Sequence, residues 1–352
     1  MKSIIKSKTS LILITICILL VFSPLFSRNL KLNSNIRDKG DIKLLVMSGN
    51  IHIDNNWTAA KSAGICTGEG TTSNPYLIKN LEIDGRGTGI CILIENSDVY
   101  FAIKNCIIYN SGDSDQGIRL FDVDNGKITD NKVSNCGVAI SLSSTFFTSS
   151  NNIILRNKLN ENGVGIELYA VSSNEVTGNT INNNEFGGIY LSYGDYNIIS
   201  ENIISNNAYG IGFYANYVYK SEYNIITNNL VKNNTNFGIY LPSHVDLNEI
   251  FLNCFIDNNA YDDGLNNQWD NGIKGNYWSD YKGSDSNNDG IGDSVYEIDG
   301  PAGSIDNFPL IKCPISTGFP ILLIVLITTI SGGAVLGVVA FLLIRRKRKR
   351  IE

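Results

Sequence analysis

A repeated asparagine restricts the fold of this chain more than any other feature of its sequence. Residues 197–207 (NIISENIISNN) contain an aliphatic residue, two spacers, Asn202, one spacer and a second aliphatic residue. This core recurs at intervals of 22 to 27 residues, and its asparagines are Asn80, Asn105, Asn131, Asn157, Asn179, Asn202, Asn229, Asn253 and Asn276. A repeat of this length predicts coils that stack on one another and bury a shared core.

Two apolar columns flank the repeated asparagine. Three residues before it stand Leu77, Ala102, Ile128, Ile154, Val176, Ile199, Ile226, Ile250 and Ile273, and two residues after it only Glu82 is polar. A second segment of each repeat has an Ile-x-Leu pattern, which places both side chains on one face of a strand. We therefore predict an all-β fold, a right-handed parallel β-helix in which stacked asparagines exchange amide hydrogen bonds. The alternative, that asparagine only marks turns, does not explain its register with two apolar columns.

The first 75 residues lie outside the repeat. Residues 1–27 begin with three lysines and continue with an apolar run of about a dozen residues, which predicts a signal peptide. An uncleaved N-terminal anchor is the alternative. Residues 28–75 are predicted to form an N-terminal cap, because the open end of a solenoid exposes apolar edges and unpaired backbone groups. The repeats then occupy residues 76–275.

The C-terminal segments predict a cap and a membrane anchor. Residues 276–312 are predicted to form a C-terminal cap that contains an Asp-rich loop. Residues 319–344 are uncharged and long enough to cross a bilayer as one helix. Residues 345–352 are mostly basic, so they are expected in the cytoplasm. The sequence thus predicts a single-pass protein of the cell membrane with residues 28–318 outside the cell.

The charge of the chain argues against a nucleic-acid partner. The formal net charge is −6, and only 18% of the 352 residues are charged. Binding to phosphates requires a basic surface, whereas here the densest basic run is the C-terminal tail. The oligomeric state does not follow from the sequence.

The Asp-rich loop carries oxygen ligands at alternate positions and a glycine at the turn, which suit the cage that calcium prefers. The predicted ligands are Asp285, Asn287, Asp289, the backbone carbonyl of Ile291, and Asp293. The loop departs from an EF-hand because its twelfth position is Tyr296. It more closely resembles the calcium-binding loops of the thrombospondin type 3 and dockerin kinds. We expect calcium as a structural ion, with an acidic turn that holds no ion as the alternative.

The cysteines beyond the signal segment show no metal-binding spacing. They are Cys66, Cys91, Cys106, Cys136, Cys254 and Cys313, and an exported chain can oxidise them. Cys106 and Cys254 share one register but are six coils apart, on the order of 29 Å, which no disulfide spans. Pairing among the other four stays open.

Residues 50–312 resemble a known family of β-helix proteins. Gly165-Ile-Glu-Leu and Gly188-Ile-Tyr-Leu, with their asparagine turns, are similar to the NosD/CASH class of repeats, whose name refers to carbohydrate-binding proteins and sugar hydrolases. The motifs GNYWSDY (275–281), DGIGD (289–293) and DNFPL (306–310) resemble the end of the NosD-like domain of archaeal surface proteins. The family name implies copper delivery to a nitrous-oxide reductase. Copper favours soft ligands, of which only His52, His244 and Met47 occur beyond the initiator methionine and the cysteines.

The outward positions of the second strand are rich in tyrosine. One column holds Arg119, Ser141, Glu167, Tyr190, Gly212 and Tyr240, and the next holds Phe121, Ser143, Tyr169, Ser192, Tyr214 and Pro242. Tyrosine rings suit sugars and protein partners alike, although tyrosine is also favoured in strands for its own sake. We expect Tyr169, Tyr190, Tyr214 and Tyr240, with Glu167, to bind a glycan or another surface protein.

The same columns provide little support for catalysis. Enzymes on this scaffold need paired carboxylates, or calcium-holding acids with a basic residue, on one outward sheet. Glu167 has no acidic neighbour one coil away in its column. A non-catalytic, surface-anchored binding module is therefore the main hypothesis. The alternatives are a polysaccharide lyase or hydrolase on the same scaffold and a NosD-like copper accessory protein.

Overall fold

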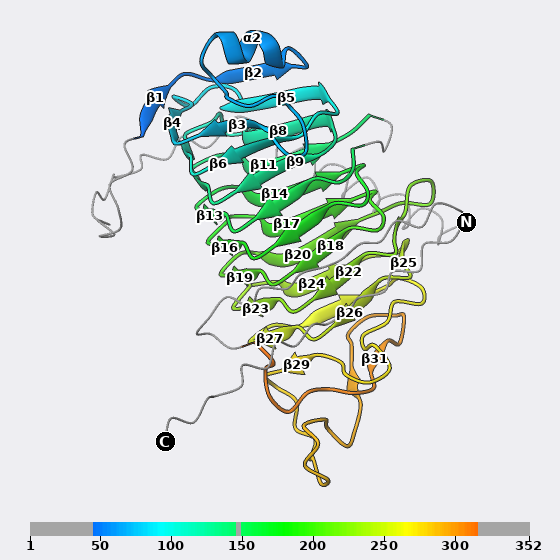
Figure 1. Ribbon diagram of the computed structural model, residues 1–352. Coiled ribbons are helices and arrows are strands. Elements are labelled where there is room, and N and C mark those ends of the chain that lie inside the picture. Colours follow the sequence, from blue (N-terminus) through cyan, green and yellow to red (C-terminus); the bar gives the residue numbers. More distant parts are fainter. Residues whose placement is uncertain (1–44, 146–148, 316–352) are drawn as a thin grey trace, which may run out of the picture. The chain divides into compact units, whose positions relative to one another are not determined.

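The structure is a computed structural model that describes residues 45–145 and 149–315. Over these residues the chain winds into a right-handed parallel β-solenoid of about eight turns (Figure 1), as the repeat predicts. Each turn contributes one short strand to each of three parallel sheets, here named A, B and C. Pairing is between coils, so strands that are distant in sequence lie side by side.

The strands follow the stacking order of the coils. Sheet A contains β1 (Val46–Ser48), β4 (Leu81–Asp84), β7 (Ile107–Tyr109), β10 (Lys132–Ser134), β13 (Lys158–Asn160), β16 (Thr180–Asn182), β19 (Ile203–Ser205), β23 (Leu230–Lys232), β27 (Cys254–Ile256) and β29 (Tyr277–Trp278). Sheet B contains β2 (Ile51–Asp54), β5 (Ile92–Ser97), β8 (Gln116–Val123), β11 (Val138–Ser143), β14 (Val164–Tyr169), β17 (Gly187–Ser192), β20 (Tyr209–Tyr214), β24 (Phe237–Leu241) and β28 (Ala260–Asp262). Sheet C contains β3 (Tyr76–Lys79), β6 (Phe101–Lys104), β9 (Gly126–Thr129), β12 (Ile153–Leu155), β15 (Glu175–Thr177), β18 (Ile198–Ser200), β22 (Ile225–Thr227) and β26 (Glu249–Phe251).

Two strand pairs and one helix complete the described chain. Strands β21 (Ser221–Glu222) and β25 (Val245–Asp246) form a parallel pair. Strands β30 (Tyr296–Glu297) and β31 (Ile305–Asp306) form an antiparallel pair in the C-terminal cap. The single helix of this part is α2 (Trp57–Ser62). Its Trp57 stacks on Tyr76 with the ring centroids 4.9 Å apart and so covers the first coil.

Aliphatic side chains fill the interior of the coils. On sheet B the Ile-x-Leu pattern places Ile140, Ile166, Ile189 and Ile211 in consecutive coils in register, and all four are fully buried. Burial of such a side chain stabilises the folded state by about 1.5 to 3 kcal/mol relative to its exposure. The residue between the Ile and the Leu of each pattern faces outward, because successive side chains on a strand point to opposite faces.

Asparagine side chains form a hydrogen-bonded ladder between sheets C and A. The amide of Asn202 donates to the Oδ1 of Asn229 and to the backbone oxygen of Val176, at 3.0 and 2.9 Å. Its own Oδ1 accepts hydrogen bonds from both nitrogens of Asn179. The same pattern joins Asn131, Asn157, Asn179, Asn202, Asn229, Asn253 and Asn276. Buried amides are thus satisfied by the coils above and below.

Two asparagines predicted for this ladder lie outside it. Cys106, not Asn105, is the residue in register with Asn131, because its backbone N–H donates to the Oδ1 of Asn131 at 2.9 Å. Asn80 and Asn105 stand one residue earlier, with left-handed φ values of 57° and 55°. The buried core residue of that coil is correspondingly Ile103 rather than Ala102. The last coil also departs from the pattern, since Ile273 is 69% exposed.

Two further asparagine ladders occupy the other turns. One joins Asn152, Asn174, Asn197, Asn224, Asn248 and Asn267, and the other joins Asn162, Asn184, Asn207, Asn234 and Asn258. The first lies before the strands of sheet C, and the second lies after the strands of sheet A. The repeat of Asn202 does not by itself predict these two ladders. The three ladders together therefore give eighteen asparagines a structural role.

The caps close the two ends of the solenoid. Strands β1 and β2 pair with β4 and β5, so regular strands begin within the segment predicted as the N-terminal cap. At the other end, Asp306 of β31 accepts hydrogen bonds from the backbone N–H of Asn276 and the indole of Trp278, at 2.7 and 2.9 Å. It terminates the ladder, and burial raises its pKa to about 6.

One disulfide ties the C-terminal cap to the last regular coil. Cys254 of β27 is bonded to Cys313, and the two Cα atoms are 5.5 Å apart. The sequence analysis left pairing open only among cysteines other than Cys106 and Cys254, so this partner for Cys254 corrects it. That argument excluded one distant pair but did not consider a cap folding back onto the coil. Cys66, Cys91, Cys106 and Cys136 are buried free thiols.

The predicted signal peptide (1–27), membrane helix (319–344) and basic tail (345–352) lie outside the described residues. Between residues 45 and 315, leaving aside 146–148, no helix is both long and apolar enough to cross a membrane.

Candidate functional site

The outward face of sheet B carries two columns of side chains in register. The first runs through His52, Leu93, Arg119, Ser141, Glu167, Tyr190, Gly212, Tyr240 and Tyr261. The second runs through Asp54, Glu95, Phe121, Ser143, Tyr169, Ser192 and Tyr214. Residues in adjacent strands of one column are about 4.8 Å apart. The two columns predicted from the sequence are therefore present as rows, except that β24 ends at Leu241 and Pro242 is not paired with Tyr214 in the sheet.

Four tyrosines form an exposed group at the carboxyl ends of these strands, here called the Tyr193 cluster: Tyr169, Tyr193, Tyr214 and Tyr219. The ring of Tyr193 contacts the other three edge-on, with centroid distances of 5.5, 5.4 and 5.6 Å. Tyr169 and Tyr214 are 45% and 43% exposed. Burial and a hydrogen bond to Tyr214 raise the pKa of Tyr193 to about 12, so its phenol is neutral near pH 7.

Tyr193 has a left-handed backbone, with a φ of 57°. The same conformation recurs at other turns of the solenoid, for example at Tyr196 and Tyr223, so it does not set Tyr193 apart. The side-chain amide of Asn216 donates to the Tyr193 hydroxyl at 3.2 Å and so helps to orient the ring.

A second aromatic group, here called the Tyr209 cluster, lies on the outward face of the same sheet, and its Tyr209 and Phe237 begin their strands. Its members are Tyr190, Tyr209, Phe237, Tyr240 and Tyr261. Tyr190 lies flat on the sheet: a Cβ built on Gly212 would come within 2.5 Å of its ring. Its hydroxyl donates to the backbone oxygen of Phe186 at 3.1 Å. The rings of this cluster are therefore less available than those of the Tyr193 cluster.

The structure divides the four predicted tyrosines into two pairs. Tyr169 and Tyr214 are joined through Tyr193, and Tyr190 and Tyr240 are joined through Tyr209. Tyr193 and Tyr209 were not singled out from the sequence, because one lies in a turn and the other at the start of a strand. The signal for both was a tyrosine two residues from the end of the Ile-x-Leu pattern, after Leu191 for Tyr193 and before Ile211 for Tyr209.

Glu167 has a polar neighbour but no acidic one. Its Oε2 accepts a hydrogen bond from Ser141 at 2.9 Å, and Tyr190 is its partner in the next strand. A carboxylate pair does occur at the N-terminal end of the face, where Asp54 and Glu95 are partners in adjacent strands. Glu95 contacts the Nε2 of His52 at 2.6 Å. The sequence analysis missed this pair because its columns began one coil later.

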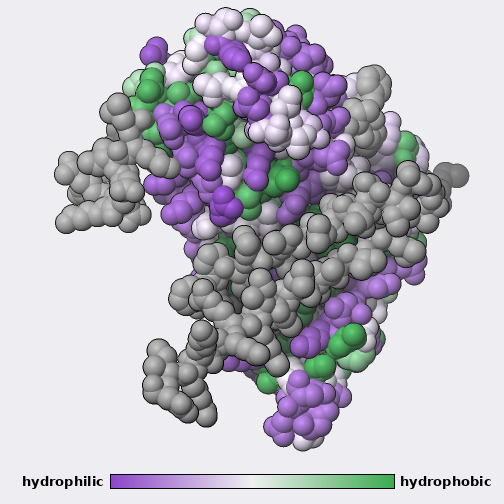
Figure 2. Space-filling view, viewed as in Figure 1, coloured by the Kyte–Doolittle hydropathy of each residue, from purple (hydrophilic) through white to green (hydrophobic). Residues whose placement is uncertain are grey.

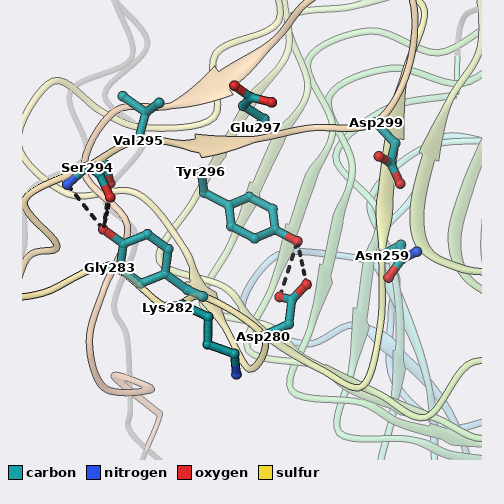
Figure 3. A pocket seen from close by; sticks show the side chains of 10 residues that line it. Asn259, Asp280, Lys282, Gly283, Ser294, Val295, Tyr296, Glu297 and Asp299 are labelled. Atoms are coloured by element: carbon teal, nitrogen blue, oxygen red, sulfur yellow. Dashed lines mark hydrogen bonds between the residues drawn. The ribbon is translucent and has the colours of Figure 1, made fainter.

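A polar hollow of about 500 Å³ lies in the C-terminal cap (Figure 3). The hydroxyl of Tyr296 faces the carboxylate of Asp280, 3.2 Å from each oxygen, and the ring stacks on Trp278 with centroids 4.2 Å apart. Asp299 and Asn259 line the opposite side (Figure 3). Figure 2 shows a mixed surface at this end of the molecule, with hydrophilic residues at the tip and hydrophobic ones beside them, and Leu265 and Ile273 are 65% and 69% exposed.

The Asp-rich loop gathers its side chains around backbone N–H groups. Asp285 accepts from the backbone of Asp289 and of Gly290, at 3.1 and 3.0 Å. Asn287 donates to Asp289, whereas Asp293 accepts from Ser284 and Ser286. Among the side chains that the structure describes, no three His, Cys, Asp or Glu residues are grouped so that they could hold a metal ion. Calcium binding here stays a prediction.

The three soft ligands considered for copper are not brought together. His52 is in β2, the first strand of sheet B, and contacts Glu95. His244 follows β24, the eighth strand of that sheet. Met47, in β1, is 65% exposed. The described residues thus form no set of these side chains around one point.

Two family models match the chain. The model described as "Periplasmic copper-binding protein (NosD)" matches residues 144–283, and the model described as "Right handed beta helix region" matches residues 42–202. The chain is a NosD-like parallel β-helix repeat protein. A curated relative is the "Probable ABC transporter binding protein NosD" of Stutzerimonas stutzeri, 41% identical over 66 residues. That match covers 18% of the NosD-like chain and 15% of the relative.

Solved structures resemble the NosD-like chain at the level of the fold. The A-module of the mannuronan C-5 epimerase AlgE4 of Azotobacter vinelandii is 16% identical, with a TM-score of 0.42 over 55% of this chain and 61% of that one. DFA-IIIase from Arthrobacter chlorophenolicus A6 is 15% identical, with a TM-score of 0.42 over 56% of this chain and 53% of that one. The NosD-like chain therefore spans only part of the length of these proteins.

Proposed function

We propose that this protein is a non-catalytic binding module that holds a glycan on the outward face of sheet B. One observation carries the proposal: the second column of that face alternates aromatic residues and serines, as Phe121, Ser143, Tyr169, Ser192 and Tyr214. Aromatic rings therefore recur on every second coil, about 10 Å apart. Flat apolar rings interrupted by small hydroxyl side chains suit the faces and hydroxyls of a sugar chain.

The Tyr193 cluster is the centre of the proposed surface. Its rings contact one another and are partly exposed, so sugar faces can pack on them without moving the backbone. The scaffold beneath them is held by inter-strand pairing and by asparagine ladders. A preorganised surface loses little conformational entropy on binding. Recognition of a surface protein by the same rings is the other outcome of a binding test.

A polysaccharide-processing enzyme is the second candidate, because Asp54 and Glu95 are adjacent on the same face and His52 contacts Glu95. Neighbouring strands place the Cα atoms of such a pair about 5 Å apart, and paired carboxylates are what glycoside hydrolysis requires. The pair lies at the end of the sheet, away from the tyrosines. We favour binding because the aromatic column contains no acid between Phe121 and Tyr214.

The proposed location is the cell surface, with the solenoid outside and a single C-terminal anchor. It rests on the composition of residues 1–27 and 319–352, outside the described part of the chain. We do not propose the copper role that the family description suggests, because His52, His244 and Met47 lie apart.

The test is binding of the full-length chain to a panel of soluble polysaccharides. A Tyr169→Ala/Tyr214→Ala double variant should bind about tenfold more weakly, since two ring contacts contribute roughly 1 to 3 kcal/mol. The matched control is Tyr196→Ala/Tyr223→Ala, which removes an exposed stacked pair, with centroids 5.1 Å apart, that lies outside sheet B. Unchanged binding by the first variant, or shortening of a polysaccharide by the parent protein, would refute the proposal.

A further inference from the structure

An arginine without a counter-ion lies on the same face as the proposed glycan surface. Arg119 is in the first column, and its guanidinium carbon is 5.1 Å from the ring centroid of Phe121 in the second column. No carboxylate among the described residues forms an ion pair with it. Its Nε is buried and has no hydrogen-bond partner. The Arg119 residue as a whole is partly exposed.

A second unpaired polar group lies one coil further along. Ser143 is 8% exposed, and its hydroxyl has no hydrogen-bond partner. It stands between Phe121 and Tyr169 in the second column. It faces outward, because its strand neighbour Leu142 is in the core. The two unpaired groups are therefore on adjacent strands of one face, immediately before the Tyr193 cluster.

The nearby acids are already engaged. Glu167 accepts the hydrogen bond of Ser141, and Glu95 contacts His52 at 2.6 Å. Buried donors are almost always paired in folded proteins, because an unpaired one loses its hydration without compensation. Two such unpaired groups on adjacent strands of one face indicate a partner that brings its own oxygen atoms. A guanidinium group matches the geometry of a carboxylate or sulfate in particular, through two parallel hydrogen bonds.

We infer that Arg119 and Ser143 form a subsite for an acidic substituent, a carboxylate or a sulfate, of the glycan that lies on the Tyr193 cluster. The inference rests on the proposed function and adds the chemical class of the ligand. Arg119 is two strands from Tyr169, about 10 Å. The acidic group is then carried roughly two sugar units away from the ring that packs on Tyr169. The guanidinium binds the acid, and the serine hydroxyl donates to a neighbouring oxygen.

The experiment compares acidic probes with neutral probes of the same backbone, using the full-length chain. Hexagalacturonate is compared with its methyl ester, and dextran sulfate with dextran, so that carboxylate and sulfate are tested separately. The parent should bind at least one acidic probe at least tenfold more tightly than its neutral counterpart, and added salt should reduce the difference. Arg119→Gln should abolish the preference, because the acidic probe loses its partner, and Ser143→Ala should reduce the preference.

The control variant is Lys158→Gln, which removes one positive charge from the exposed face of sheet A. It should retain the full preference. If the parent binds neutral and acidic probes equally, or if Arg119→Gln keeps the preference, the acidic subsite is wrong while the glycan surface stands. If none of the four probes binds, both proposals fail. Should Arg119→Gln not fold, Arg119→Lys decides, because it keeps the charge but lacks the paired donors, and an undiminished preference in it contradicts the inference.

Discussion

At the scale of single residues, asparagine combines two properties that this fold needs. Its amide donates and accepts at once, so identical side chains can bond to one another in a column. Asn202 does so with Asn179 and Asn229. Asparagine also tolerates the left-handed backbone at turns, as Asn206 and Asn228 do with φ of 56° each. Ladder and turn asparagines therefore stand side by side in the sequence.

Replacing one ladder asparagine should destabilise the fold clearly. Asn202→Ala removes the acceptor shared by the backbone N–H and the side-chain amide of Asn179. The backbone N–H is left buried and unpaired, whereas the side-chain amide keeps the backbone oxygens of Ile154 and Thr177. The expected loss is about 1 to 3 kcal/mol in the free energy of unfolding. Denaturant titration of the parent and the variant measures it.

The matched control is Asn160→Ala in β13. Asn160 accepts a hydrogen bond from Asn182 on the outer face of sheet A, where it is partly exposed to solvent. Asn160→Ala should lower the free energy of unfolding by well under half as much as Asn202→Ala, because water can replace the lost hydrogen-bond partner. Equal effects of the two substitutions would show that burial in the ladder adds nothing. Asn207 is unsuitable as a control because it is a buried member of another ladder.

The register of the asparagine ladder could be predicted from the sequence in most coils but not in the first ones. From Asn131 onward a β-branched or aliphatic residue three places earlier fixed the register, and the ladder has that register. In the first coils either Ala102 or Ile103 could be the core residue, and Cys106 stands where later coils have the ladder asparagine. The local spacing does not distinguish these two registers, because the register depends on which residue contacts the next coil.

At the scale of elements, strands were predictable and their turns were not. The Ile-x-Leu pattern located the strands of sheet B from β8 to β24 and the outward positions on them. The contacts that join the outward tyrosines come from Tyr193 and Tyr209, which lie beside the pattern. Turn lengths vary between repeats, so the position of a turn side chain depends on the fold of the neighbouring turns.

The Asp-rich loop is expected to stabilise the fold by binding calcium. Calcium at ten times its dissociation constant should stabilise the folded state by about 1.4 kcal/mol, and extracellular modules bind calcium at roughly 0.1 to 1 mM. The carboxylate of Asp289 now accepts only from Asn287 and the backbone N–H of Ile291, so it can turn toward an ion. The melting temperature of the full-length chain should therefore rise with calcium.

Asp289→Ala should abolish this rise, whereas Asp299→Ala, an acid in the cap but outside the loop, should keep it. Magnesium at the same concentration controls for ionic strength, since it prefers a smaller and more rigid cage. An identical melting temperature of the parent in chelator and in excess calcium would mean that the loop is a hydrogen-bonded turn without an ion.

At the scale of the whole molecule, the solenoid depends on what closes its ends. Each coil contacts only its neighbours, so an open end exposes unpaired backbone and apolar side chains. At the N-terminal end Trp57 stacks on Tyr76. At the C-terminal end Trp278 packs between Phe255 and Tyr296, and Asp306 receives the last donors of the ladder. The sequence indicated a cap at each end, but the partners in each cap are specific to this chain and follow no repeat.

The disulfide makes the C-terminal closure covalent, and its removal is the prediction for the whole molecule. Cys254 and Cys313 are 59 residues apart in sequence, so the bond encloses the entire C-terminal cap. Closure of a loop of this length stabilises a fold by about 4 kcal/mol in the chain-entropy model. Cys313→Ser should therefore lower the melting temperature, and limited proteolysis should cut the cap before it cuts the coils.

Reductant should have the same effect on the parent but none on Cys313→Ser, because the remaining described cysteines are buried free thiols. If thiol titration shows the bond reduced and yet the cap of the parent resists protease as before, the closure is held by Asp306 and Trp278 alone.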